Sequence, residues 1–170
     1  MQKTFDKFIF LALLISCQSI FAQAPSKQDS IWQRNYQKRI RQSKLYGVYI
    51  PQNLGDAHNQ LNKLISKESK EKFRRMTEDQ VRHKLFFSLG RWIIYNWGFY
   101  DGSRLSDRLR KLGIYHPEDM AEFIIITYHR KMLQQPLNAK ELIEQMTEKR
   151  KKEWEKRHKV TILPKPKAPN

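Results

Sequence analysis

Apolar residues recur along most of this chain at three- and four-residue intervals, which is the period of an α-helix. After a short extended segment at 47–51, leucines at this spacing predict a helix that ends near residue 66. Either Asn53 or Asp56 can cap its start. The strongly charged stretch 67–76 predicts a short helix or a turn.

A longer helix is predicted from Thr77, which can form a capping box with Gln80, to Gly98, which suits the position just beyond a helix end. Its first half has one apolar face, and its second half is apolar nearly all round, which is typical of a buried helix. The face is predicted to hold Val81, Leu85, Leu89 and Trp92.

Three further helices are predicted. The first is capped by Ser103 or Asp101 and closes at Gly113, and the second begins at Pro117 with two carboxylates in its first turn. This second helix is apolar enough to be buried. The third follows Asn138 and is basic at its far end.

These patterns predict an all-α fold without a pair of strands. We expect a single compact domain of five to six helices with two buried central helices, spanning residues 46–137. A basic amphipathic arm, residues 25–45, precedes it, and a basic C-terminal helix with a Pro/Lys tail, residues 138–170, follows it.

The first 24 residues have the pattern of a secretory signal peptide. Lys3 and Lys7 precede a short apolar run, and small residues follow, with cleavage sites after Ala22 or Ala24. The run is shorter than the roughly 20 apolar residues of a membrane-spanning helix. The alternative is a lipoprotein signal that ends before Cys17, the only cysteine, which would then carry the lipid. Both predict export to the periplasm or cell envelope.

Positive charge is concentrated in the two flanks. The chain has a formal net charge of +16, and residues 25–45 contain six basic residues and one acidic residue. A basic helix in this arm can lie on an anionic membrane surface, but we favour packing of Trp32 and Tyr36 on the domain, because charge runs usually mark solvated faces. The charge favours an anionic envelope component or a protein partner. Export argues against a nucleic acid.

Aromatic rings are densest in the segment 91–105. Such rings either fill a core or form a recognition surface, and the sequence leaves both open. In the first case Asp101 and Arg104 would form an internal ion pair. In the second case the binding residues would be Tyr95, Asn96, Trp97, Phe99, Tyr100, Asp101 and Arg104, with His116 and Arg130 as further candidates.

No established catalytic or metal-binding motif is present, so no cofactor and no metal are predicted. His116 and Asp119 lie three residues apart at a helix start, where they could act with Arg104 as the catalytic groups of an envelope hydrolase or transferase. That hypothesis requires the three side chains to meet in one open cleft. For His116 we favour a capping role, because helix ends must satisfy their free N–H groups.

Four motifs in fixed order resemble an uncharacterised bacterial domain family. They are VYIPQNL, YNWGFYDGSRL, LGIYHPEDM and ITYHRKML, and the resemblance covers roughly Val48 to Leu137. Tyr95 stands where members often have an asparagine. The resemblance implies a recurring domain without a known activity, and the basic flanks lie outside it. Its motif positions are Asn96, Trp97, Gly98, Gly102, Ser103, Arg104, His116, Pro117, Asp119 and Arg130.

We therefore expect an exported helical module of the bacterial envelope that binds a ligand or partner, with the loop 95–104 as its candidate recognition surface. The alternative is the envelope hydrolase or transferase described above. The oligomeric state is not indicated by the sequence.

Overall fold

The computed structural model describes residues 27–158. The predicted signal peptide with Cys17 and the predicted Pro/Lys tail beyond residue 158 lie outside the described residues. The chain divides into two units, residues 1–33 and residues 34–170. The fold and the candidate site belong to the second unit.

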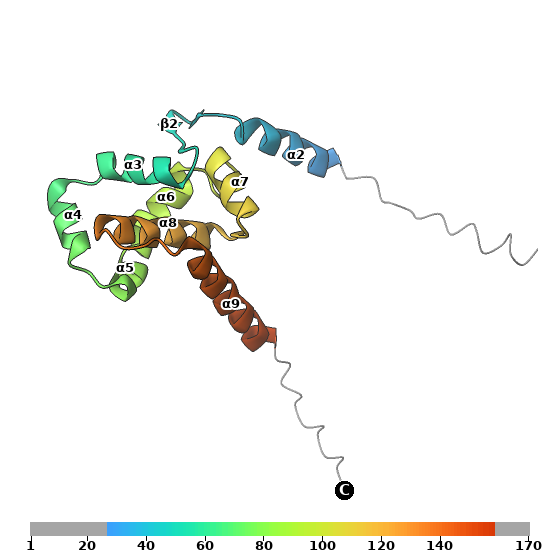
Figure 1. The fold of residues 1–170 in the computed structure, drawn as a ribbon. Helices are drawn as coiled ribbons and strands as arrows, with labels where there is room; N and C mark the ends of the chain where they lie inside the picture. The colour runs from blue at the N-terminus through green and yellow to red at the C-terminus, as the bar shows by residue number, and fades with distance from the viewer. Residues whose placement is uncertain (1–26, 159–170) are drawn as a thin grey trace, which may run out of the picture. The chain divides into compact units, whose positions relative to one another are not determined.

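The described part of the chain is mostly helical (Figure 1), which confirms the all-α prediction. Residues 27–158 contain eight α-helices and one π-helix, more than the five to six helices predicted. They are α2 (Lys27–Arg39), α3 (Leu54–Leu64), α4 (Lys67–Arg74), α5 (Glu78–Lys84), the π-helix η1 (Phe86–Gly90), α6 (Arg91–Asn96), α7 (Arg104–Lys111), α8 (Pro117–Met132) and α9 (Ala139–His158).

The prediction that no strands pair is wrong for one short hairpin. Strand β1 (Lys44–Leu45) pairs antiparallel with β2 (Val48–Tyr49). The two residues between them have positive φ, 50° at Tyr46 and 82° at Gly47. Two positive φ values are what a tight type I′ hairpin turn requires, and a glycine provides the second without strain.

Local capping sets the helix starts largely as predicted. The side chain of Asn53 accepts a hydrogen bond from the Asp56 backbone at the start of α3, and Ser103 caps α7. Thr77 and Gln80 form the predicted capping box at the start of α5. These signals are readable in the sequence because each joins residues three positions apart.

The single helix predicted from Thr77 to Gly98 is interrupted by the π-helix η1, in which the Gly90 N–H donates to the Leu85 carbonyl at 2.9 Å. A π-turn inserts an extra residue, which rotates every following side chain around the helix axis. The predicted continuous face is therefore broken. Val81 is buried, Trp92 is exposed, and Ile93 fills the core in its place.

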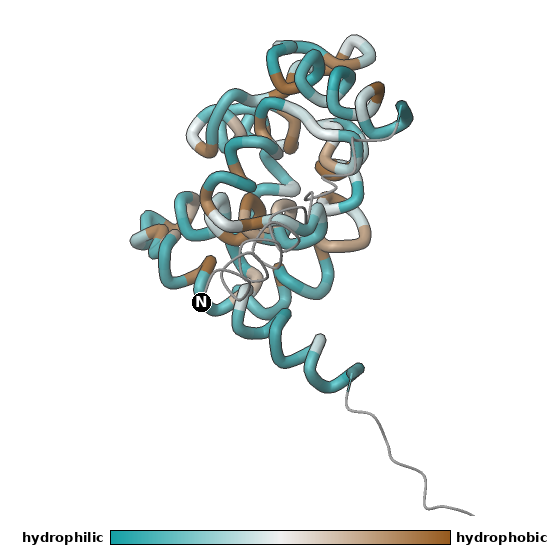
Figure 2. The backbone as a smooth tube through the Cα atoms, turned by 90° about the vertical axis from the view of Figure 1, so that its right-hand side faces the viewer, coloured by the Kyte–Doolittle hydropathy of each residue, from teal (hydrophilic) through white to brown (hydrophobic). Residues whose placement is uncertain are grey.

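Helix α8 is the central element of the second unit, as Figure 1 shows, and it confirms one of the two predicted buried helices. It contacts α3, α4, α5, η1, α6, α7 and α9. Helix α9 packs on it through Leu142 and Met146, which are buried, whereas the last three turns of α9 have no buried residue and are mostly hydrophilic in Figure 2. No helix between residues 27 and 158 combines the length and the apolar character needed to cross a membrane.

Candidate functional site

The loop after α6 places two of its rings in the core. Gly98 has a φ of 64°, and the backbone N–H groups of Gly98 and Phe99 donate to the carbonyls of Tyr95 and Ile94. This Schellman arrangement ends the helix at the predicted glycine and turns the chain back on itself. Phe99 is buried as a result, and so is Trp97 at the end of α6. The prediction that both belong to an exposed recognition surface is therefore wrong.

Arg104 donates hydrogen bonds to a backbone carbonyl and does not form an ion pair with Asp101. Its Nε and Nη2 atoms donate to the Ile50 carbonyl at 2.8 and 2.5 Å, and its guanidinium lies 5.1 Å from the centre of the Tyr49 ring. Asp101 instead pairs with Arg39 at 3.5 Å. This corrects the predicted internal pair. The partner of Arg104 is a carbonyl 54 positions away, which no local pattern indicates.

Residues 36–39 cover one side of the same loop. The Nε of Arg39 donates to the Gly102 carbonyl at 3.0 Å, and the hydroxyl of Tyr36 donates to Asp107 at 3.0 Å. A Cβ added at Gly102 would lie 2.4 Å from the Tyr36 ring. Glycine is thus required here both by its φ of 92° and by the closeness of this ring. Packing of Tyr36 on the domain agrees with the interpretation favoured for the arm.

Two predicted rings do remain on the surface. Tyr95 and Tyr100 are 63% and 53% exposed, and their ring centres lie 5.7 Å apart. The Tyr100 hydroxyl donates to Glu118 at 3.3 Å. Partial burial and the Glu118 carboxylate raise the pKa of Tyr100, and the charge of Arg91 opposes this increase.

Phe87, in the π-helix, extends this surface. It is 75% exposed. In α6, Arg91 lies four positions before Tyr95, so these two share one side of that helix. We call Phe87, Arg91, Tyr95, Tyr100 and Glu118 the aromatic face. Asn96, another predicted binding residue, instead turns back to its own helix, where its side-chain amide donates to the Trp92 carbonyl at 2.9 Å.

A groove of about 270 Å³ adjoins the aromatic face, with walls from α5, η1, α8 and α9. Phe87 and Glu118 belong to both the face and the groove. Phe86 and Met146 supply apolar surface, and Arg82, Lys149 and Glu153 are among the charged side chains around it.

Asp119 and Arg150 form an ion pair that borders this groove. The Nε and Nη2 of Arg150 donate to the two carboxylate oxygens of Asp119 at 3.0 and 2.5 Å, and these bonds raise the pKa of Arg150. The pair also lines a second cavity of about 130 Å³, together with His116. Arg104 lines neither cavity, so it does not meet His116 and Asp119 in one cleft. His116 occupies the N-cap position of α8 without a side-chain capping bond, which corrects its predicted capping role.

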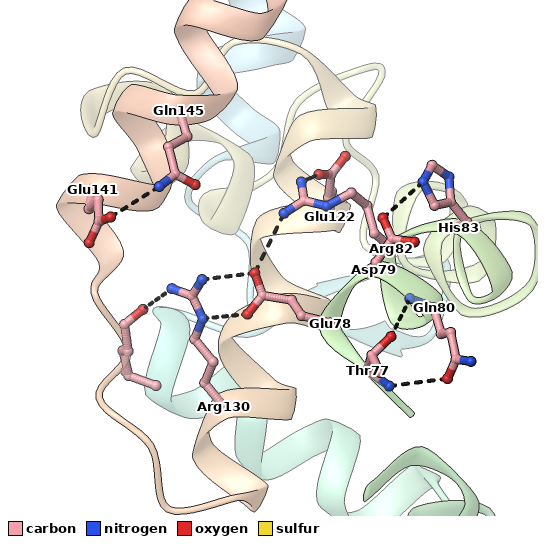
Figure 3. Close-up of polar contacts among 11 residues, drawn as sticks. Thr77, Glu78, Asp79, Gln80, Arg82, His83, Glu122, Arg130, Glu141 and Gln145 are labelled. Atoms are coloured by element: carbon pink, nitrogen blue, oxygen red, sulfur yellow. Dashed lines mark hydrogen bonds and ion pairs between the residues drawn. The ribbon is translucent and has the colours of Figure 1, made fainter. Parts of the chain in front are cut away.

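Arg130 belongs to a network that joins α5 to α8 (Figure 3). It donates two hydrogen bonds of 2.8 Å to Glu78 and a third of 2.8 Å to the Leu137 carbonyl. Arg82 lies 3.6 Å from the same Glu78 carboxylate and also bonds Glu122. The bonds from Arg130 lower the pKa of Glu78. Because its donors are engaged and its side chain is largely buried, Arg130 is a structural residue, and its prediction as a binding residue is corrected.

Sequence reasoning missed the groove residues, most clearly Phe87, Glu118, Lys149 and Arg150. Phe87 lies in a stretch that is apolar nearly all round and was predicted to be buried, yet it is 75% exposed. Arg150 reaches Asp119 across 31 positions. Among the residues that the structure describes, no group of three or more His, Cys, Asp or Glu side chains is placed to hold a metal ion.

Residues 50–132 match the model of a protein family described as a domain of unknown function (DUF6794). This confirms the predicted resemblance of this segment to an uncharacterised domain family. The matched residues contain the whole aromatic face, whereas residues 36–39 and α9 lie outside the match. The comparison with curated proteins and the comparison with solved structures gave no match.

Proposed function

We propose that this protein is a binding module that recognises its ligand or partner through the aromatic face. The observation that carries the proposal is the pair of exposed tyrosine rings, 5.7 Å apart, of which Tyr100 bonds Glu118 in the wall of a groove. Tyrosine and arginine are enriched among the residues that dominate binding energies. A tyrosine also offers a large contact area at a small cost in side-chain entropy.

Buried neighbours and a hydrogen bond fix the position of the aromatic face. Trp97 and Phe99, which alternate with surface residues in this segment, are anchored in the core. The Gly98 turn sets the position of Tyr100, and the Tyr100 hydroxyl bonds α8. A surface that is ordered before binding loses less entropy on association, which favours affinity.

We further propose that the protein acts after export, at the bacterial cell envelope. This rests on the signal-peptide pattern of residues 1–24 and on the basic flanks. The exposed end of α9 carries Lys151, Lys152 and Lys156 into solvent. Such charges attract anionic envelope polymers or lipid headgroups and would hold the module close to them.

The hydrolase or transferase alternative receives less support from the geometry. Asp119 is bound at both oxygens by Arg150, and Arg104 is occupied by the Ile50 carbonyl. Groups that act together on a substrate must converge on it, and Arg104 lines neither of the two cavities that Asp119 lines. His116 lines the second cavity and makes no side-chain capping bond.

Site-specific photo-crosslinking in cells that produce the protein tests the binding function. A photoreactive phenylalanine analogue placed at Tyr100 should yield a discrete cross-linked product. The matched control is Tyr46, a tyrosine that is 89% exposed on the hairpin turn and lies outside the aromatic face. Tyr95→Ala should reduce the product at least about tenfold, as expected for an energetically dominant contact. Equal products from positions 100 and 46, or none from position 100, would refute the proposal.

A further inference from the structure

We infer that the groove beside the aromatic face binds a short, uncharged saccharide. This inference rests on the proposed binding function and names the chemistry of its ligand. Three observations carry it: the mixed charge of the groove walls, the spare hydrogen-bonding capacity of those walls, and the exposed ring at the edge of the groove.

The charges of the walls disfavour an ionic ligand. Four carboxylates and three permanent cations line the groove, so a bound ion of either sign would lose its hydration close to charges of its own sign. The carboxylates belong to Glu118, Asp119, Glu122 and Glu153, and the cations to Arg82, Lys149 and Arg150. A ligand with many hydroxyl groups and no net charge avoids this cost.

The same walls suit hydroxyl groups. Arg150 uses its Nε and Nη2 atoms for Asp119, which leaves N–H donors on its third nitrogen. Glu118 accepts one hydrogen bond from Tyr100, whereas a carboxylate has about four acceptor sites. Each sugar hydroxyl both donates and accepts, so neighbouring hydroxyls can bond an arginine and a carboxylate together. The ion pair keeps Asp119 and Arg150 in place before the ligand arrives.

Phe87 supplies an apolar surface for the face of a sugar ring. It is 75% exposed, and its ring meets Phe86 edge-on, with centres 5.3 Å apart and an interplanar angle of 85°. The negative face of an aromatic ring attracts the weakly positive C–H groups on one face of a pyranose. Phe87 belongs to the π-helix, and π-helices occur frequently at functional sites. The Tyr100 hydroxyl bonds Glu118, which lines the groove.

The volume of the groove limits the length of the ligand. About 270 Å³ lies just under the roughly 300–1,000 Å³ of typical small-molecule pockets. It therefore accommodates about one or two sugar rings, and the rest of a longer chain would remain in solvent or cross the Tyr95–Tyr100 pair. Weak affinity for a single ring and tighter binding of a short oligosaccharide follow from this geometry.

Saturation-transfer NMR and isothermal titration with maltotetraose, cellotetraose and triacetylchitotriose test the inference. We expect saturable binding of at least one of them, with a Kd of about 1 mM or below. Phe87→Ala and Glu118→Gln should each weaken that binding at least about tenfold, and Tyr46→Ala should leave it unchanged. Both substituted side chains line the groove outside the buried core, so the fold should tolerate the changes. Raising the salt to about 0.5 M should change the Kd less than about twofold, since the ligand is uncharged.

Absence of saturable binding by all three saccharides at about 10 mM would overturn the inference. So would binding that both substitutions leave intact, or a strong loss of affinity with salt, which would indicate an ionic ligand. Cross-linking from position 100 separates the two proposals. If cross-linking persists while no saccharide binds, the saccharide inference fails and the binding function stands. If both experiments fail, the proposed function fails as well.

Discussion

Acidification should destabilise this protein through His58, which is buried between α3 and α8 and is 2% exposed. Its Nε2 lies 3.0 Å from the Thr127 hydroxyl oxygen. The Thr127 hydroxyl donates to the backbone of its own helix, where the Phe123 and Ile124 carbonyls lie at 2.7 and 3.1 Å. The ring of His58 must therefore donate to Thr127 through Nε2–H, so the neutral imidazole satisfies this contact without a second proton.

Burial, followed by the positive charge of Lys131, lowers the pKa of His58 from 6.5 to about 4. Between these two values the unfolded chain takes up a proton that the folded protein does not. The free energy of unfolding therefore falls as the pH falls through this window. At about 1.4 kcal/mol per pKa unit, the loss between pH 7 and pH 4.5 is about 2 kcal/mol. His129 acts in the same direction, because burial lowers its pKa as well.

Urea unfolding of the wild type and of His58→Gln at about pH 7 and about pH 4.5 measures this contribution. Glutamine retains an N–H donor for Thr127 but takes up no proton. The wild type should lose about 2 kcal/mol more than the variant on acidification. The contributions of carboxylates and of His129 cancel in this comparison, because both proteins contain them. Equal losses in the two proteins would refute the reasoning.

Two further predictions concern the packing around the site. Gly102→Ala should lower the free energy of unfolding by about 2 kcal/mol more than Gly113→Ala. Both glycines have similar positive φ, but an added Cβ would meet the Tyr36 ring at Gly102 and nothing within 4 Å at Gly113. Thermal unfolding measures this difference in stability. If the difference remained the same in a Tyr36→Ala background, the clash with the Tyr36 ring would not be its cause. Arg130→Met should lower the free energy of unfolding by about 1–2 kcal/mol, because Glu78 loses both bonds from Arg130 and keeps only the longer contact with Arg82. Lys140→Met, at an exposed pair of 4.0 Å, is the control in urea titrations and should change stability by less than about 0.5 kcal/mol.

The sequence by itself determined the local features of this protein. The helical class, the capping box at Thr77, the cap at Ser103 and the helix end at Gly98 were all predictable. Each depends on residues within about four positions of one another, so the physical cause lies inside a short window of sequence. The burial of α8 could also be predicted from the sequence, because its apolar residues cover nearly the whole helix surface.

Only the tertiary structure decided which rings are buried and which charges meet. The extra residue of the π-helix rotates the side chains after it, so Trp92 is exposed while Ile93 faces the core. With 33 basic and 17 acidic residues in the chain, residue types alone leave many pairings open. The contact of Arg150 with Asp119 and that of Arg104 with the Ile50 carbonyl span 31 and 54 positions. Such contacts exist only once the helices have packed, and the groove forms from the same packing.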